Sequence, residues 1–298
     1  MDAPGCPVTV RCPAKLNLFL EVLGRRPDGY HDIDTVMQAI DLYDELHIAP
    51  RAGPALRLEC DCAGLPSDER NLALRAAMAL KEETGYPGGA RLRLTKRIPV
   101  GAGLGGGSSD AAGALVGLDR AWGLGLRDEG LRQLAARVGS DVAFFLRGGT
   151  ARCTGRGEAV EPAAARLRAR YALVCPPLSV STAEVYKKLR FPLTPTGARA
   201  SMLVQCLAQG DVEGLGATLY NRLEEPAFHL YPGLREGKSR LEATGLFAGV
   251  LMTGSGAALF GLRRPRSPDR LPRSLASLGL GTWYAVRGIG HGVGVCSR

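Results

Sequence analysis

The chain has 298 residues, of which 45% are hydrophobic and 22% are charged. This length suffices for two domains of ordinary size, and the composition excludes a disordered or a fibrous protein. No uninterrupted apolar run approaches the roughly 18 residues of a membrane-spanning helix. Residues 1–11 lack the basic start and the apolar stretch of a signal peptide. We therefore expect a cytoplasmic protein with no membrane partner.

The formal net charge of +9 is unevenly distributed along the chain. Residues 1–150 contain 18 basic and 19 acidic side chains, whereas residues 151–298 contain 20 basic and 10 acidic ones. A basic half could face a nucleic acid or an acidic small molecule. No aromatic residues that could stack on bases are interleaved with its arginine cluster, which favours a solvated surface and no nucleic-acid partner. The cluster consists of Arg263, Arg264, Arg266, Arg270 and Arg273.

The eight cysteines could indicate disulfides or a zinc site. Only Cys60 and Cys62 lie close together, and no second pair or histidine-rich partner completes a metal-ligand pattern. Several cysteines lie in apolar runs, such as Cys175 in Ala-Leu-Val-Cys, where a free thiol packs as a small hydrophobic side chain. We therefore expect structural thiols.

The first half of the chain predicts a series of strands followed by helices. Strands are predicted over residues 9–22 (interrupted at Pro13-Ala14-Lys15), 34–40, 45–49, 55–62 and 90–98, with a turn by composition at 25–32. Helical spacing predicts three helices. The first covers residues 71–84 and is ended by Gly85, the second follows the glycine-rich residues that end at 107, and the third lies around residues 128–138.

The second half of the chain is richer in predicted helices. Residues 148–157 are turn-rich, and residues 161–170 are typical of a connector. Strands are predicted over residues 171–175, 250–253, 257–262 and 282–287, and helices over 182–189, 197–209, 212–219 and 234–244, with a short helix before the last strand. Mixed helices and strands in both halves indicate two α+β domains joined near residues 160–170.

A glycine-rich loop over residues 99–112 is the clearest functional signal in the chain. It reads Pro-Val-Gly-Ala-Gly-Leu-Gly-Gly-Gly-Ser-Ser-Asp-Ala-Ala and lies between a predicted strand and a predicted helix. Its glycines allow positive φ and let backbone amides approach a ligand, while Ser108, Ser109 and Asp110 offer N-cap and first-turn chemistry for the helix. Unpaired N–H groups and the helix dipole then converge on one spot, which favours binding of a nucleotide phosphate.

Other interpretations of this loop fit less well. No Gly-Lys-Ser/Thr follows it, which excludes a Walker A site. A dinucleotide fingerprint would need an acidic residue at a strand end about 20 positions later. Asp128 and Glu129 fall there, but they lie in a turn-like stretch. A flexible linker stays open as an alternative, although linkers rarely join a clean strand to a clean helix.

Three separated segments together resemble the motifs of the GHMP kinases, the family of galactokinase, homoserine kinase, mevalonate kinase and phosphomevalonate kinase. In chain order they are Pro13-Ala14-Lys15-Leu16-Asn17-Leu18, the glycine loop, and Met252-Thr253-Gly254-Ser255-Gly256. The resemblance spans about residues 9–287, and it is strengthened by Arg26-Pro27-Asp28-Gly29-Tyr30-His31, Gly139-Ser140-Asp141-Val142 and Gly155-Arg156-Gly157-Glu158.

The resemblance implies a fold, a reaction and a substrate. The fold would be α+β, with an S5-like N-terminal domain over residues 1–160 that binds ATP and a ferredoxin-like C-terminal domain over residues 161–298. The reaction would be phosphorylation of a small-molecule alcohol by ATP, with Mg²⁺ bridging phosphate oxygens. Within the family the chain is most similar to members that phosphorylate the 2-hydroxyl of 4-diphosphocytidyl-2-C-methyl-D-erythritol in the non-mevalonate isoprenoid pathway.

The resemblance assigns catalysis to Lys15 and Asp141. Phosphoryl transfer needs positioning, charge neutralisation and a group that accepts the hydroxyl proton, and Asp141 would be that general base. Lys15 interrupts an apolar strand, where an ammonium is costly unless it is paired. We expect it to pair with Asp141 and to polarise the hydroxyl or stabilise the transferring phosphoryl group. The structural alternatives are a turn acid for Asp141 and a surface lysine for Lys15.

The binding residues follow from the same resemblance. Tyr30 would stack on the cytosine ring and His31 would hydrogen-bond to it, while Asn17 lies on the same strand face as Lys15 and within reach of the substrate. Ser109 or Asp110 could contact Mg²⁺, but the metal ligands are left open. The predicted ATP-binding residues are Lys96, Pro99, Val100, Gly101, Ala102, Gly103, Leu104, Gly105, Gly106, Gly107, Ser108 and Ser109.

The sequence departs from the usual family pattern at two positions. Ala257 stands where many members have serine and Ala143 where many have proline, and neither change removes a charged group, so we expect activity. The alternatives are a GHMP kinase for another alcohol, a non-catalytic sensor and a nucleic-acid binder. Retention of Lys15 and Asp141 argues against a sensor, and the near-neutral charge of residues 1–150 argues against a nucleic acid.

Overall fold

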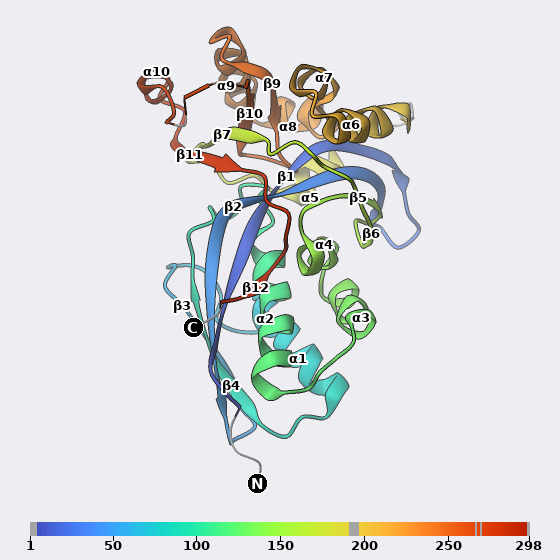
Figure 1. Cartoon of the computed structure of the whole chain (residues 1–298), viewed down its shortest axis with the longest axis vertical. Helices are drawn as coiled ribbons and strands as arrows, with labels where there is room; N and C mark the ends of the chain where they lie inside the picture. The colour runs from blue at the N-terminus through green and yellow to red at the C-terminus, as the bar shows by residue number, and fades with distance from the viewer. Residues whose placement is uncertain (1–4, 191–196, 266, 269, 297–298) are drawn as a thin grey trace.

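The structure, a computed structural model, describes residues 5–190, 197–265, 267–268 and 270–296. The first four residues of the N-terminal stretch and Arg266 of the arginine cluster lie outside these ranges. Within them, helices and strands form two halves, each built on its own sheet (Figure 1). The predicted α+β fold class is therefore confirmed. None of the helices in the described ranges is long and apolar enough to cross a membrane.

A long hairpin of two strands runs through both halves of the molecule. β1 (Val8–Arg25) and β2 (His31–Arg51) pair antiparallel and pass from the N-terminal half to beneath the second sheet (Figure 1). The predicted interruption of the first strand and the predicted gap before residue 45 are both wrong. Between the pairs Pro13–Tyr43 and Ala14–Ile40, two residues of β2 have no partner, so a bulge absorbs the irregularity and both strands continue.

The first sheet collects strands from distant parts of the chain. β12 (Gly294–Val295), β1, β2, β4 (Gly89–Thr95) and β3 (Leu56–Cys60) follow one another, β5 (Thr150–Gly155) joins β2 to β6 (Ala159–Pro162), and β8 (Tyr220–Asn221) pairs with β1. The prediction of turns over residues 148–157 is wrong for β5. Pairing of β5 with β2 supplies backbone hydrogen bonds and buries Ala151 and Cys153, and this long-range gain outweighs the turn-prone composition.

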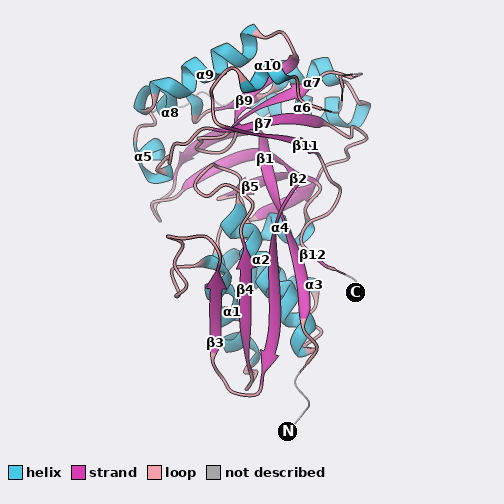
Figure 2. Ribbon diagram, turned by 90° about the vertical axis from the view of Figure 1, so that its left-hand side faces the viewer, coloured by secondary structure: helices cyan, strands magenta, loops and turns pink. Residues whose placement is uncertain are grey.

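Four helices cover one face of the first sheet, and in Figure 2 they lie behind the strands. They are α1 (Leu72–Thr84), α2 (Gly106–Trp122), α3 (Asp128–Val138) and α4 (Val142–Arg147). The predicted limits of α1 and α3 are confirmed. The Asn71 side chain accepts a hydrogen bond from the Ala73 amide at the start of α1, and Gly85 ends that helix with a φ of 63°.

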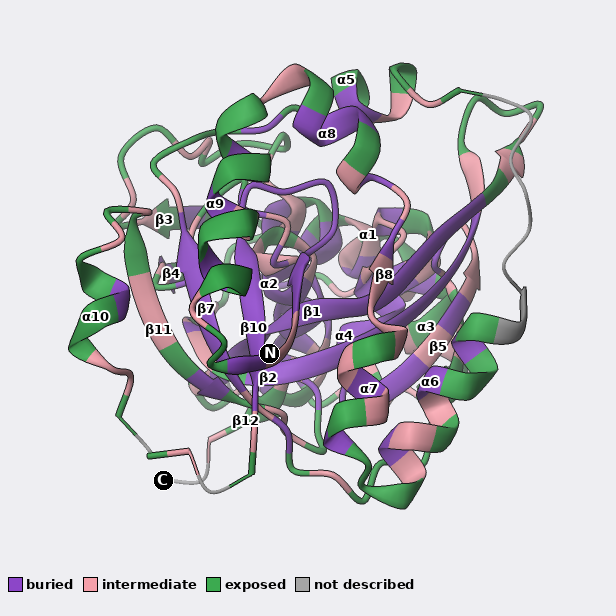
Figure 3. Ribbon diagram, turned by 90° about the horizontal axis from the view of Figure 1, so that it is seen from above, coloured by how far each residue is buried: buried purple, intermediate pink, exposed green. Residues whose placement is uncertain are grey.

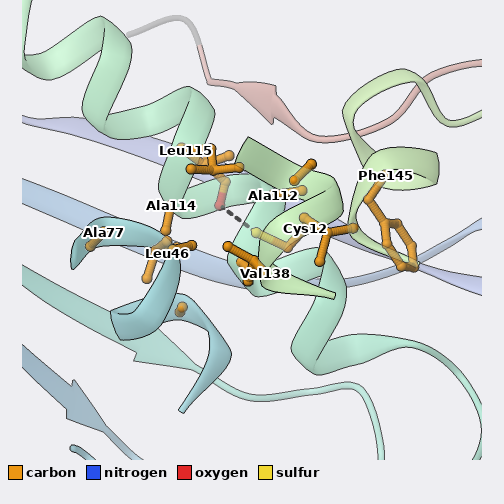
Figure 4. Packing of buried hydrophobic residues seen from close by; sticks show 14 of the residues in the cluster. Cys12, Leu46, Ala77, Ala112, Ala114, Leu115, Val138 and Phe145 are labelled. Atoms are coloured by element: carbon orange, nitrogen blue, oxygen red, sulfur yellow. Dashed lines mark hydrogen bonds between the residues drawn. The ribbon is translucent and has the colours of Figure 1, made fainter. Parts of the chain in front are cut away.

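Small residues let α2 lie close to the sheet. Figure 4 shows Ala112 and Ala114 of α2 packed in one cluster with Cys12 and Leu46 of the sheet. A Cβ atom on Gly113 would lie 2.4 Å from the Cys12 sulfur. Any larger side chain there would push the helix, and with it the glycine loop at its start, away from β1.

The second sheet has the strand order β11 (Thr282–Arg287), β7 (Arg170–Cys175), β10 (Leu259–Arg263) and β9 (Phe247–Met252), and every pairing is antiparallel. Between β7 and β9 lie α5 (Thr182–Lys187), α6 (Gly197–Gln209), α7 (Val212–Thr218), α8 (Glu224–Leu230) and α9 (Pro232–Ala243), and α10 (Arg273–Ala276) precedes β11. This β-α-β-β-α-β order is ferredoxin-like. Sequence reasoning missed α8, which carries Pro226 in its first turn, where proline is tolerated.

The two halves share a hydrophobic core. Leu16 and Leu18 of β1 pack in one buried cluster with Leu173 of β7, Phe260 of β10 and Leu203 of α6. The C-terminal segment also returns to the first half, where β12 pairs with β1. A division of the chain at residue 160 stays a prediction, and β8 and β12 add strands from after that point to the first sheet.

The cysteines are free thiols, and Cys12, Cys153 and Cys175 are buried among hydrophobic side chains. Burial raises the pKa of each of these three thiols above its usual value. This agrees with the prediction that they pack as small hydrophobic groups.

Candidate active site

A cavity of about 1080 Å³ lies where the two halves meet. Its walls come from β1, the turn after it, the glycine loop, the segment before α4, α5 and the turn between β9 and β10. The predicted site residues that line it are Lys15, Asn17, Tyr30, His31, Gly103, Gly105, Ser108 and Asp141. The fold therefore brings together segments from nearly the whole length of the chain.

The glycine loop is shaped by three residues with positive φ. Gly101, Gly103 and Gly105 have φ values of 68°, 77° and 72°. A Cβ on Gly103 would lie 2.3 Å from the carbonyl oxygen of Thr253, and one on Gly105 would lie 2.8 Å from the Phe145 ring. Glycine is therefore required at both positions by backbone conformation and by space.

Helix α2 begins earlier than its sequence predicts. Gly105 is the N-cap and makes no side-chain capping bond, and the helix starts at Gly106. The prediction of an N-cap among Ser108, Ser109 and Asp110 is wrong, because the positive φ of Gly105 already turns the chain into the helix. Ser108 does lie in the first turn, as predicted. A glycine cap leaves the first amides of α2 without a side-chain acceptor, and such amides bind anions well.

Lys15 is buried at the centre of the cavity wall. Its side chain donates to Asn17 Oδ1 at 2.5 Å and to the Gly103 carbonyl at 2.7 Å, and the residue is 3% exposed. Burial lowers the pKa of Lys15 from its usual value, and the Asp141 carboxylate opposes this shift. The contact with Gly103 ties the ammonium to the glycine loop.

Asp141 lies just before α4 with its side chain free of capping contacts. Within the described ranges no donor reaches its carboxylate, and no ion pair within 4.0 Å joins it to Lys15. The expected direct pairing with Lys15 is therefore wrong, because the Lys15 ammonium is held by Asn17 and Gly103 instead. Both carboxylate oxygens therefore remain available to a ligand in the cavity that the two residues line.

Aromatic and cationic side chains line the far part of the cavity. Tyr30 is 54% exposed, and the Arg156 guanidinium lies over its ring at 5.1 Å. The His31 ring lies 4.8 Å from the Tyr186 ring, and burial together with Arg25 lowers the pKa of His31. Burial raises the pKa of Tyr186, and Asp141 adds to the rise. This group of rings suits a flat, partly polar ligand.

Models of protein families match both halves of the chain. The N-terminal domain of the GHMP kinases matches residues 71–149, and the C-terminal domain matches residues 203–279. The chain is 46% identical to the 4-diphosphocytidyl-2-C-methyl-D-erythritol kinase of Pelotomaculum thermopropionicum, over 86% of this chain and 88% of that protein. The protein of the same name from Shouchella clausii is 41% identical over 85% of each chain. The chain belongs to the GHMP kinase family.

Solved structures agree with this membership. A crystal structure of 4-(cytidine 5'-diphospho)-2C-methyl-D-erythritol kinase has a TM-score of 0.77 and 38% identity, covering 95% of this chain and all (100%) of that chain. The homoserine kinase from Cytophaga hutchinsonii has a TM-score of 0.80 at 19% identity over 99% of both chains. The second likeness concerns the fold alone.

In this GHMP kinase, Lys96 is held in a buried ion cluster beneath the glycine loop. Its ammonium donates to Asp44 and, at 2.7 Å, to Asp110, and its side chain is 6% exposed. Burial by itself lowers the pKa of Lys96. The two carboxylates raise it by a larger amount, so the pKa of Lys96 lies above its usual value. Burial raises the pKa of Asp110 to about 7, with Lys96 opposing and Asp44 adding to the rise. Contact between Lys96 and a nucleotide stays a prediction.

Several predicted ATP-binding residues do not line the cavity. Ser109 is fully buried with an unpaired hydroxyl oxygen, and one Asp110 oxygen is likewise buried and unpaired. Ala257 is buried, and the nearby Ser255 hydroxyl shares a hydrogen bond of 2.7 Å with Thr182. The residues outside the lining are Lys96, Pro99, Val100, Gly101, Ala102, Leu104, Gly106, Gly107 and Ser109.

Sequence reasoning missed several residues of the cavity wall, among them Arg156 and Tyr186. Arg156 belongs to Gly155-Arg156-Gly157-Glu158, one of the segments that resemble the family, but no role was predicted for it. Tyr186 lies on α5 in the other half, and no local pattern distinguishes it from an ordinary core tyrosine. Within the described ranges, no group of three His, Cys, Asp or Glu side chains could hold a metal ion.

Proposed function

We propose that this GHMP kinase transfers the γ-phosphoryl group of ATP to the 2-hydroxyl of 4-diphosphocytidyl-2-C-methyl-D-erythritol, giving the 2-phosphate and ADP. The observation that carries the proposal is the shared cavity, which Lys15, Asp141, the glycine loop and the Tyr30-His31 turn line together. Relatives up to 46% identical carry the name of this kinase. The protein then acts in the non-mevalonate isoprenoid pathway.

Asp141 is the general base of the proposed reaction. Its free carboxylate takes the proton of the 2-hydroxyl while the hydroxyl oxygen forms a bond to the γ-phosphorus. The bond from that phosphorus to the oxygen bridging the β- and γ-phosphates breaks, and the electron pair leaves with ADP. The buried Lys15 ammonium, fixed by Asn17 and Gly103, stabilises the charge on the transferring group.

The glycine loop and the start of α2 fit the phosphates of ATP. Gly103 and Gly105 line the cavity without side chains, and their positive φ turns the backbone into the start of α2, where amides can face an anion. Ser108 presents a hydroxyl to the cavity next to these amides. Anions are favoured at this helix end by the dipole as well as by the free N–H groups.

Magnesium fits the donor set only in part. Mg²⁺ usually keeps several waters and takes one or two protein ligands besides phosphate oxygens. When bound, it would neutralise part of the charge of the phosphates. Ser108 is the first-turn oxygen of α2 that reaches the cavity, so it would hold the ion, whereas Ser109 and Asp110 are buried behind it.

The far part of the cavity suits a cytidine diphosphate group. Tyr30 can stack on the base, and His31, held against Tyr186, can hydrogen-bond to its edge. Arg25, Arg156 and Lys187 line the same cavity, and their positive charge complements the substrate's diphosphate.

A coupled assay of ADP release tests the proposal. We expect turnover with 4-diphosphocytidyl-2-C-methyl-D-erythritol and little with mevalonate or homoserine. Asp141→Asn should lower kcat by about 10²–10⁴-fold while an ATP analogue still binds, because only the general base is lost. The matched control is Asp128→Asn at the exposed first turn of α3, which should keep its activity. Turnover on mevalonate or homoserine instead would overturn the substrate, and near-normal kcat in Asp141→Asn would overturn the base.

A further inference from the structure

A second cavity, of about 490 Å³, lies beside the active site on the C-terminal half. It is formed by the end of α5, one face of α8 and the start of α9, which Figure 3 shows as neighbours along one side of the molecule. Its charged lining consists of Lys187, Lys188, Arg190, Arg222, Arg235 and Glu225. Five cationic side chains therefore face one carboxylate.

Most of these cations lack a protein counter-charge. In the described part of the chain, Lys187, Lys188 and Arg190 make no ion pair. The Arg235 guanidinium lies over the Phe228 ring at 6.0 Å, which leaves its N–H groups free for a ligand. Arg222 is the exception, because it lies 3.9 Å from the buried Glu21. Like charges that converge in a concave surface repel one another unless an anion lies between them.

The size and chemistry of the cavity point to a small phosphate-bearing anion. Its volume falls within the range of about 300–1,000 Å³ typical of small-molecule sites. Guanidinium groups match phosphate oxygens with two parallel hydrogen bonds, and ammonium groups add point charges. We propose that this cavity is a second anion site, separate from the glycine loop, which binds a small molecule through a diphosphate group.

The second cavity shares a wall with the active site. Lys187 and Leu189 line both cavities, whereas Lys188, Arg190 and Arg235 line only the second. An anion in the second cavity therefore holds Lys187, which is then less available to a ligand in the first. Residues that line only the second cavity are the right ones to substitute in a test.

Calorimetric titration of inorganic pyrophosphate into the full chain tests the proposal. A saturating, non-hydrolysable ATP analogue occupies the glycine loop, and ionic strength is held constant because surface charges are screened by salt. We expect saturable binding that depends on the cations lining only the second cavity. Lys188→Gln and Arg235→Gln should each weaken binding about tenfold or more, because each removes a charge-assisted hydrogen bond. Circular dichroism of each variant checks that it folds.

The matched control is Arg240→Gln, which removes the same charge from an exposed position of α9 outside the cavity. It should bind pyrophosphate as the unmodified chain does. Absence of saturable binding, displacement by the ATP analogue, or equal weakening in Arg240→Gln would each overturn the site. Equally tight binding of citrate would overturn the assignment to phosphate chemistry. The titration needs no phosphoryl transfer, so its failure and the failure of the proposed kinase reaction are distinguishable.

Discussion

At the scale of single residues, the candidate active site depends on glycines whose lack of a side chain lets neighbouring backbone segments approach closely. Gly103 combines a φ of 77° with a neighbouring carbonyl oxygen, that of Thr253, only 2.3 Å from where a Cβ would lie. The same residue offers its own carbonyl to Lys15. Its conformation therefore sets both the shape of the loop and the position of the ammonium.

We predict that Gly103→Ala destabilises the protein and damages catalysis. Positive φ alone costs roughly 1–2 kcal/mol for a residue with a Cβ, and the collision with Thr253 adds about 1–3 kcal/mol. A displaced loop should also lower kcat/KM by about 10²-fold. Urea unfolding and the coupled assay measure the two effects.

Gly123→Ala is the control, because Gly123 has a similar φ of 67° but nothing lies within 4 Å of its Cβ position. It should show the cost of conformation alone and keep its activity. Equal losses of stability in the two variants would show that the collision with Thr253 does not matter.

At the scale of elements, the start of α2 is anchored by a buried ion cluster. Lys96 follows β4, Asp44 lies on β2 and Asp110 lies in the first turns of α2, so the cluster joins two strands to the helix. Asp44 Oδ1 also accepts hydrogen bonds from the amides of Arg97 at 2.6 Å and Ile98 at 2.9 Å. Burial raises the pKa of Asp110, and the nearby Asp44 carboxylate adds to the rise, while the shared Lys96 ammonium opposes it.

We predict that Asp110→Asn flattens the dependence of stability on pH. The folded chain binds a proton at Asp110 up to about pH 7, whereas the unfolded chain releases it near 3.8. The stability contributed by this proton is therefore present at low pH and lost as pH rises toward 7. The free energy of unfolding of Asp110→Asn, relative to that of the unmodified chain, should rise by about 1 kcal/mol or more from pH 5 to pH 8. Urea unfolding at both values measures the difference.

Asp119→Asn provides the matched control on the same helix. Asp119 accepts a hydrogen bond from the Leu126 amide at 2.8 Å and belongs to no ion cluster in the described ranges. If both variants gave the same change with pH, the effect would belong to net charge rather than to the cluster.

At the scale of the whole molecule, the C-terminal segment ties the two halves together. After β11, the Gly288 amide donates to Ala169 and the Ile289 amide to Ala39. The Val293 amide then donates at 2.9 Å to Phe145 of α4, the helix that follows Asp141. The position of Asp141, the proposed general base, thus depends on a segment at the other end of the chain.

We predict that Gly292→Ala displaces this segment. Its Cβ would lie 2.1 Å from the Phe145 carbonyl oxygen and 2.8 Å from the Gly148 amide, and backbone atoms cannot move aside as a flexible side chain can. The cost should be about 1–3 kcal/mol of stability, with a lower kcat because α4 shifts. Thermal unfolding and the coupled assay measure these effects.

Gly294→Ala in β12 is the control, since nothing lies within 4 Å of its Cβ position. Unchanged thermal stability and kcat in Gly292→Ala would show that the segment does not hold α4.

Local patterns in the sequence determined much of this protein. Asn71 and Gly85 define α1, and the spaced motifs around Lys15 and Asp141 identify the family. The glycine loop predicts an anion site. These features are readable because caps, positive φ and short motifs are encoded by neighbouring residues. Turn-rich residues 150–155 were misread, since their strand forms only by pairing with β2.

Only the tertiary structure decided how these pieces meet. It placed Tyr186 beside His31, bound Lys96 to two carboxylates, fixed the Lys15 ammonium on Gly103 rather than on Asp141, and gathered the cations of the second cavity. Each of these contacts joins residues that are distant along the chain. Their geometry is set by the packing of sheets and helices, which no local pattern encodes.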